Sequence, residues 1–387
     1  MRYIGGGIGS AQYPSLLRWA VKHMNQLVPA IMAACVFGAT ATMLPAVALA
    51  QSAEHGAAPI APALNLEDVA AASGLPGLTV TNALGRVAHL FPTVPAAVLR
   101  SQAIQTPPLL YHSGGSIMST ASIYSIFWVP SNLQNGRSTS LTASYESLMT
   151  RLAGDYPAHG IDNNNTECFQ IIGTTKTYVQ NVGSSAGFYV DSSLFPASGC
   201  SDSATPGNCI TDAQIRSEIQ KVMALQGWTG GLNHIFLLYT SSGEGSCFDP
   251  RSTACAYVQY CAYHSFISAS PPVIYGNIPY GNTSVCQLTG TPSPNGFPAA
   301  DAVMTSASHE ISESITDPLL NAWFTSDGSE IGDLCAYDYG TNAWDSGNAN
   351  QAWNGHFYVL QTEFDNHAYT LGFAGCVQVG PFGEPPG

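Results

Sequence analysis

The stretch from Ser306 to Pro318 reads SASHEISESITDP, and its composition is that of a helix that ends before a proline. It gathers a histidine, two glutamates and an aspartate in a chain of 387 residues, of which only 9% are charged. Residues four positions apart lie on the same face of an α-helix, so His309 and Glu313 project together. These side chains could form either a solvated helix face or a metal site.

The spacing is that of H-E-x-x-H zinc helices, with a glutamate in place of the second histidine. Imidazole nitrogen and carboxylate oxygen are both zinc ligands. We therefore predict His309 and Glu313 as metal ligands, and Glu310 as the catalytic general base that acts on a metal-bound water. The flanking residues are small or apolar, which predicts a buried helix, and a buried acid cluster without a metal would be costly.

A catalytic zinc site needs a third protein ligand. The segment DGSEIGDLC, which follows the proline-terminated helix and an aromatic loop, offers Glu330 and Asp333. We favour Glu330 as the third ligand of one Zn²⁺ ion and Asp333 as the acid that orients His309 from behind. The reverse assignment of these two acids stays open.

Strand and helix patterns alternate between residues 109 and 387. Apolar, β-rich runs predict strands within 122–130, 168–180, 186–192, 233–241 and 356–364. Helical periodicity predicts helices within 140–156, 211–228 and 299–316, the second capped by Thr211 and ended by Gly227. The predicted fold is α/β, a mixed sheet with flanking helices, a zincin-like active-site helix and loops stapled by disulfides.

The N-terminal region has the pattern of a signal peptide over residues 1–50. Arg18 and Lys22 precede an apolar run, and Ala48-Leu49-Ala50 supplies a small-x-small cleavage pattern. A transmembrane helix is the alternative, but Pro45 and small residues interrupt the run. Residues 51–108 are Ala/Pro-rich and predict a linker or a pro-segment, and residues 109–387 a single catalytic or binding domain. We therefore expect a secreted protein, extracellular or periplasmic.

Charge and cysteine content fit secretion. Cleavage would leave 8 of the 11 basic residues beside 25 acidic ones, a net charge of −17, which argues against nucleic acid or an anionic membrane as a partner. Nine cysteines would remain, enough for four disulfides and one free thiol. We favour the pairs Cys200/Cys209 and Cys335/Cys376. The sequence leaves open the pairing of Cys247, Cys255, Cys261 and Cys286, and a zinc knuckle there lacks any Cys-x-x-Cys.

Other catalytic patterns are weaker. The sequence contains no P-loop or dinucleotide glycine fingerprint. Glu310 and Glu313 lie too close on one helix to flank a glycosidic bond. His234 falls in an apolar strand and predicts a core histidine. Three further residues could stabilise an oxyanion beside a zinc site or simply belong to the core or surface: Tyr337, His356 and His367.

Three segments resemble the phosphate-induced, EXORDIUM-like family of secreted proteins. They are LLYHSGGSIMSTASIYSIFWVP (109–130), IFLLYTSSGEGSCFDPRSTACAYVQYCAYHS (235–265) and NGFPAADAVMTSASHEISESITDPLLNAWF (295–324). The resemblance covers most of Leu109 to Cys376 and implies secretion and these domain limits. Plant members, which are associated with extracellular growth signalling, look to lack the His-Glu pair. Bacterial and fungal relatives look to carry H-E-x-x-E followed by E-I-G-D-x-C, which maps here onto Glu330, Asp333 and Cys335.

These observations together predict a secreted zinc-dependent hydrolase, specifically a metallopeptidase that acts on a protein or peptide. The alternative is a non-catalytic extracellular module that binds a cell-wall component or another protein, with a structural metal or none. Neither function involves nucleic acid, or a membrane once the signal peptide is removed.

Overall fold

A computed structural model describes residues 79–101, 108–139, 141–157, 160–161, 163–251, 254–340 and 348–378. The predicted signal peptide and the Ala/Pro-rich segment up to residue 78 lie outside these residues. The described part belongs to one compact unit.

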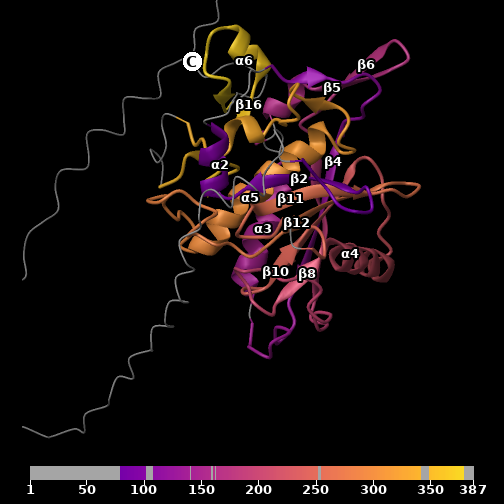
Figure 1. The fold of residues 1–387 in the computed structure, drawn as a ribbon. Helices are drawn as coiled ribbons and strands as arrows, with labels where there is room; N and C mark the ends of the chain where they lie inside the picture. Colours follow the sequence, from indigo (N-terminus) through magenta and orange to yellow (C-terminus); the bar gives the residue numbers. More distant parts are fainter. Residues whose placement is uncertain are drawn as a thin grey trace, which may run out of the picture. The chain divides into compact units, whose positions relative to one another are not determined.

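A seven-stranded mixed sheet forms the centre of this unit, and Figure 1 labels its strands β2, β4, β11 and β12. The strand order is β1-β2-β11-β12-β9-β4-β7. The strands from β12 to β7 run parallel, whereas β11 pairs antiparallel with both β12 and β2. Most residues of β4 and β9 are buried, as expected for parallel strands that are covered on both faces. The strands are β1 (Thr79–Thr81), β2 (Val87–Pro92), β4 (Ala121–Trp128), β7 (Gly183–Asp191), β9 (His234–Thr240), β11 (Tyr260–Ile267) and β12 (Val273–Ile278).

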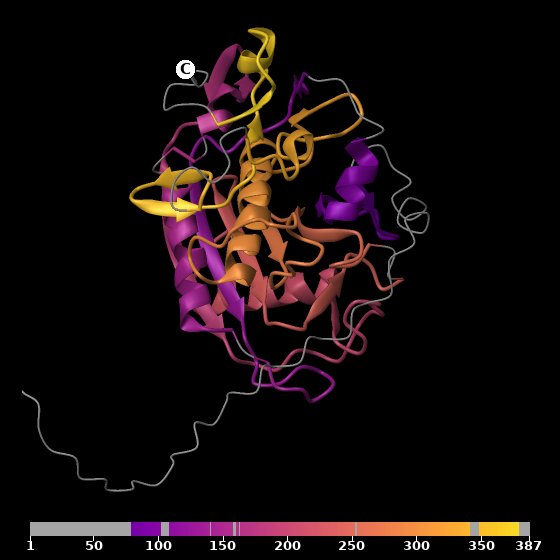
Figure 2. The ribbon, with the colours of Figure 1, turned by 90° about the vertical axis from the view of Figure 1, so that its left-hand side faces the viewer.

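Helices cover both faces of the sheet. Helix α3 (Ala143–Asp155) and helix α5 (Pro298–Thr316) lie side by side on one face (Figure 2). Successive side chains of a strand point to opposite faces. Tyr263 of β11 donates its hydroxyl hydrogen to Asp212 of helix α4 (Asp212–Gln226), whereas the next residue, His264, contacts Glu310 of α5. Helix α4 therefore begins on the face opposite to α5.

The helix ends follow the local sequence. Thr211 caps α4 as predicted and forms a capping box with Gln214, and Gly227 ends the helix with a positive φ of 68°. Pro298 occupies the first turn of α5, where a missing N–H costs nothing, and Pro318 follows the end of the helix. Within the described ranges, no helix combines the length and the apolarity needed to cross a membrane.

Short elements surround this core. Two-stranded pairs connect β3 (Leu110–Tyr111) with β13 (Trp323–Phe324), β5 (Phe169–Ile172) with β6 (Thr175–Tyr178), β8 (Cys209–Thr211) with β10 (Gly245–Cys247), β14 (Gln351–Trp353) with β15 (His356–Tyr358), and β16 (Glu363–Phe364) with β17 (Cys376–Val377). The short helices are α2 (Val94–Ser101), η1 (Asn163–Glu167), η2 (Asp333–Cys335) and α6 (Asn366–Thr370). The single strand expected within 356–364 is thus divided between β15 and β16.

The predicted domain start at Leu109 is wrong. Strand β2 lies within 51–108, yet it pairs with β11 inside the central sheet, and Leu90 and Phe91 are buried in the core. The apolar run of β2, VAHLFP, is only six residues long and lies in Ala/Pro-rich surroundings, so its composition resembles a linker. The domain therefore includes at least Thr79 to Ser101.

Four disulfides staple the loops. The predicted pairs Cys200–Cys209 and Cys335–Cys376 are confirmed, and the pairing left open is Cys247–Cys255 and Cys261–Cys286. Cys168 is the one free cysteine of the described residues, and it is buried. Four bridges are typical of proteins from oxidising compartments.

The longest disulfide loop should contribute most to stability. Cys335 and Cys376 are separated by 41 residues, and Cys200 and Cys209 by 9. Loop-closure entropy predicts a loss of about 4 kcal/mol when the first pair is changed to serines and about 2.5 kcal/mol for the second. Denaturant unfolding of the two double-serine variants measures both values. Equal losses would contradict an entropic origin.

Candidate metal centre

Helix α5 is buried along almost its whole length. His309, Glu310 and Glu313 are 0% exposed, so the interpretation of these residues as a solvated helix face is wrong. Nε2 of His309 lies 3.0 Å from Oε1 of Glu313, as the spacing of four residues predicts. The helix therefore carries an imidazole and two carboxylates into the interior, where each ionised group needs a partner.

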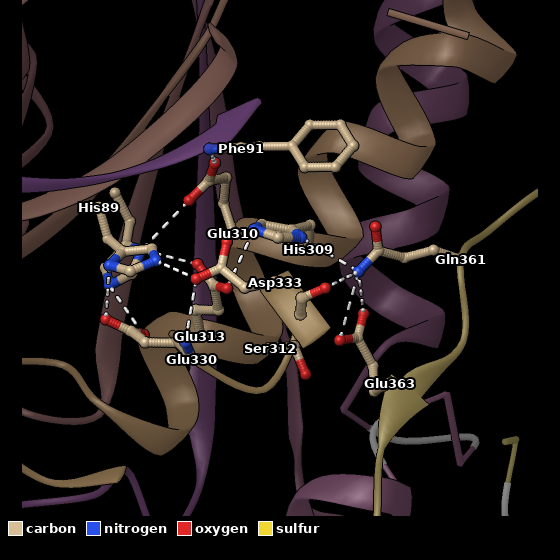
Figure 3. Close-up of polar contacts among 12 residues, drawn as sticks. His89, Phe91, His309, Glu310, Ser312, Glu313, Glu330, Asp333, Gln361 and Glu363 are labelled. Atoms are coloured by element: carbon tan, nitrogen blue, oxygen red, sulfur yellow. Dashed lines mark hydrogen bonds and ion pairs between the residues drawn. The ribbon is translucent and has the colours of Figure 1, made fainter. Parts of the chain in front are cut away.

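Two histidines from neighbouring strands meet this face of α5. His89 of β2 and His264 of β11 are direct cross-strand partners, which places both side chains on the same face of the sheet. Nδ1 of His264 lies 3.1 Å from Glu310 Oε2 and 3.5 Å from Glu313 Oε2. The Phe91 N–H, also from β2, donates to Glu310 Oε1 at 3.2 Å. The two strands thus contact both glutamates of the motif (Figure 3).

The loop that leads into η2 brings two more acids to the histidines. Asp333 Oδ2 lies 2.5 Å from His89 Nε2, and it also accepts the N–H of Glu330 at 3.0 Å. Glu330 contacts the other nitrogen of His89, Nδ1, at 3.1 Å, and it lies 3.7 Å from His264 Nε2. Both predicted downstream acids therefore belong to the cluster, although neither makes its closest contact with His309.

A second support lies behind His309. Gln361 Nε2 lies 3.0 Å from His309 Nδ1 and donates to the carbonyl of Gly332 at 2.9 Å. A Cβ at Gly332 would approach His309 Nδ1 to 2.5 Å, so this position requires glycine. Glu363 lies 3.4 Å from the same Gln361 nitrogen. These contacts fix the imidazole that faces Glu313.

The donor atoms fit a divalent cation. Both oxygens of Glu313, Nε2 of His309, Nε2 of His264 and Oε2 of Glu330 are buried and have no hydrogen-bond partner of acceptable geometry. Several of them nevertheless lie within ion-pair distance of one another. Buried polar atoms that converge without forming hydrogen bonds are the arrangement that a bound cation satisfies. Imidazole nitrogens and carboxylate oxygens are ligands that suit Zn²⁺ and related ions.

Two groups of three residues each bring one donor atom within 4.8 Å of the others. The first group is His89, Glu313 and Asp333, and the second is His264, Glu310 and Glu313. Glu313 belongs to both groups. The predicted set of His309, Glu313 and Glu330 is not one of these groups, although all three residues lie in the cluster.

The contacts favour the reverse of our preferred assignment for the two downstream acids. Asp333 shares a group with His89 and Glu313, which fits a ligand. Glu330 contacts His89 through Nδ1, the nitrogen that faces away from Asp333. The His264 nitrogen that Glu330 approaches is Nε2, at 3.7 Å. Carboxylates placed behind ligating imidazoles orient them and fix their tautomer. Glu330 therefore fits the orienting role, directed at His89 and His264 rather than at His309.

The pKa values of these histidines and glutamates are shifted by burial and by the charges of their neighbours. Burial alone would lower the pKa of His264, but its contacts with Glu310 and Glu313 raise it to about 9. Burial opposes protonation of His309 too, and Glu313 beside it raises its pKa to about 10. Burial would raise the pKa of Glu313, yet the neighbouring histidines hold it below its usual range. Burial raises the pKa of Glu330 well above its usual value, with nearby acids adding to the shift. The histidines therefore favour the ionised form of Glu313, whereas burial and the nearby acids favour the neutral form of Glu330.

His89 and His264 were missed in the sequence. His89 lies in the segment assigned to a linker, and His264 in an aromatic strand, YCAYHSFI, that carries no ligand spacing. The sequence offered one signal for them: each histidine lies in an apolar run, and the two would meet if these runs paired as neighbouring strands. That pairing joins segments far apart in the chain: the Ser265 hydroxyl, for example, donates to the carbonyl of Val87, 178 residues away.

The other candidate residues make separate contacts. His234 Nδ1 lies 2.6 Å from the carbonyl of Thr229. His356 binds Asp155, and Tyr337 donates to the carbonyl of Pro92. Tyr337 approaches the centre only through Phe91, whose ring contacts both Tyr337 and His309. His367 lies in α6, where its backbone N–H donates to Glu167. The sulfurs of Cys200, Cys209 and Cys247 also lie close together, but each belongs to a disulfide, which argues against a zinc knuckle.

One known protein is similar to part of this chain. "Protein EXORDIUM-like 3" from Arabidopsis thaliana is 33% identical over an alignment that covers 21% of this chain and 31% of that protein. This partial similarity suggests the EXORDIUM-like family. No family model matches the chain, and no solved structure matches it. The chain thus spans about a third of its EXORDIUM-like relative, so the activity of a whole protein cannot be carried over.

Proposed function

We propose that this chain is a secreted metal-dependent hydrolase with Zn²⁺ as its cation and a peptide bond as its target. The observation that carries the proposal is Glu313, a fully buried carboxylate that faces histidines with neither oxygen hydrogen-bonded. The H-E-x-x-E helix adds the residue types that hydrolytic zinc sites use. The four disulfides and the predicted signal peptide support secretion.

The residues of the first group, His89, Glu313 and Asp333, would hold the ion. A bound Zn²⁺ ion supplies a Lewis acid at this position. Glu330 orients the His89 ring through its contact with Nδ1. Gln361 orients the ring of His309, which lies beside Glu313, through the same ring position. Peptide hydrolysis also needs a group that accepts a proton and returns it to the leaving amine.

Glu310 is the proton acceptor if a single ion binds. Its Oε2 lies 3.1 Å from His264, and its Oε1 accepts the Phe91 N–H, so the carboxylate is held beside Glu313. Burial raises its pKa, which brings a carboxylate closer to the range useful for proton transfer near neutral pH. Whether or not Glu310 also binds metal, hydrolysis should depend on it.

Glu310→Gln is expected to lower hydrolysis of an unfolded protein substrate by about 100-fold or more, because the amide cannot accept a proton. The variant should fold and should keep the ion held by His89, Glu313 and Asp333. Peptide release, measured beside metal content and thermal unfolding, tests this. Glu244→Gln is the matched control, because Glu244 is equally buried but lies outside the cluster. Unchanged activity in Glu310→Gln would contradict the proposal.

Burial of the cluster favours a second candidate function. None of the histidine or glutamate residues in the cluster is more than 2% exposed, so a substrate has no direct access to them in this conformation. A purely structural metal would have this environment, in an extracellular module that binds a cell-wall component or another protein. This candidate predicts a folded, metal-containing wild type without activity on peptide and ester substrates.

A further inference from the structure

Glu313 belongs to two groups of possible ligands. His89 and Asp333 form one group with it, and His264 and Glu310 form the other. The two histidines are cross-strand neighbours whose ring centroids lie 5.9 Å apart. The sheet therefore supplies one imidazole to each group, and α5 with the η2 loop supplies the carboxylates.

We propose that the cluster binds two divalent transition-metal cations, bridged by the carboxylate of Glu313. This inference deepens the proposed function and rests on its metal cluster. A bridging carboxylate needs both oxygens available to cations. Neither oxygen of Glu313 makes a hydrogen bond of acceptable geometry, although Nε2 of His309 lies 3.0 Å from Oε1. Each group offers one nitrogen and two oxygens, a donor set that suits Zn²⁺ or Mn²⁺.

Buried acids surround both groups of possible ligands. Four carboxylates are buried together here, those of Glu310, Glu313, Glu330 and Asp333. The ion pairs that the structure gives them are with histidines. Imidazoles that bind metal are neutral, so the positive charge beside these acids would come from bound cations and from His309, which belongs to neither group.

Glu330 fits this arrangement as the residue shared behind the two sites. It lies 3.1 Å from Nδ1 of His89 and 3.7 Å from Nε2 of His264, and these are the ring nitrogens that face away from Asp333 and Glu310 respectively. One carboxylate can therefore orient both imidazoles. Glu310 becomes a ligand of the second cation through Oε2, and its Oε1 keeps the hydrogen bond from Phe91.

Metal counting tests the inference. The purified full chain is stripped with a chelator and titrated with Zn²⁺ alone, and we expect two equivalents per folded chain. His264→Ala should bind one equivalent, Asp333→Ala should bind one, and Glu313→Ala should bind none with comparable affinity. Glu363→Gln is the matched control and should bind two, because Glu363 is a buried acid next to the cluster but belongs to neither group.

The outcomes separate this inference from the proposed function. One equivalent in the wild type, unchanged in His264→Ala, would overturn the second cation and leave a single-ion hydrolase. No bound metal would overturn both. Mn²⁺ loading of the wild type gives a measurement that needs no variant. Two ions that share a carboxylate should show a spin-coupled electron paramagnetic resonance spectrum, and a spectrum of isolated Mn²⁺ at full loading would overturn the bridge.

Discussion

A chain that begins at Leu109 is expected neither to bind metal nor to fold stably, in contrast to one that begins at Gln51. The shorter chain lacks β2, whose residues from Ala88 to Pro92 are all buried. Burial of Leu90 and Phe91 alone contributes on the order of 5 kcal/mol, comparable with the whole stability of many domains. Strand β11 would also become an exposed edge that favours aggregation. Near-ultraviolet circular dichroism, thermal unfolding and metal content measure the effect.

Point variants separate the two roles of β2. His89→Ala removes one imidazole from the cluster but leaves the pairing with β11, so it should lower metal binding more than it lowers secondary structure content. Leu90→Ala leaves the cluster intact and should destabilise the fold by about 2–5 kcal/mol with metal content unchanged. If the chain from Leu109 folds and binds metal like the longer one, β2 is dispensable, and the segment before Leu109 is a linker after all.

The elements that the sequence predicted correctly are those with a local signal. Helix α4 has a threonine cap, a regular apolar face and a terminal glycine, and all three lie within seventeen residues of one another. Helix α5 has the H-E-x-x-E spacing and a terminal proline. The short Cys200–Cys209 loop follows from proximity in the chain. In each case, the interactions that decide the structure join residues close in sequence.

The missed features depend on contacts between distant segments. Strand β2 has no stable structure of its own, and it becomes a strand because β11 offers it an edge. His89 and His264 become neighbours through the same pairing. The roles of Glu330 and Asp333 depend on which imidazole each acid reaches, and the missing histidines made that unpredictable. An E-x-x-D pattern identifies candidate ligands, whereas the tertiary fold assigns them.

Removal of divalent cations from the wild type should lower its midpoint of thermal unfolding by about 10 °C, and Glu313→Ala should show no such response. A ligand that binds only the folded state at about 1,000 times its dissociation constant stabilises that state by about 4 kcal/mol. One kcal/mol corresponds to about 2–4 °C in a domain of this size class. Scanning calorimetry with and without chelator measures the shift, which Zn²⁺ should restore. Glu363→Gln, which keeps both ligand groups, should respond like the wild type.

A metal-free cluster would behave differently with pH. Its carboxylates would then depend on protonated His264 and His309, whose folded pKa values of about 9 and about 10 lie above those of unfolded histidine. A group with a raised folded pKa stabilises the fold fully below its unfolded pKa, and this contribution is lost as the pH rises through the folded value. The stability of such a protein would not change when chelator is added, and it would fall between about pH 7 and pH 10. A chelator-insensitive wild type with this pH profile would contradict the metal centre and would identify the cluster as a buried network of ion pairs.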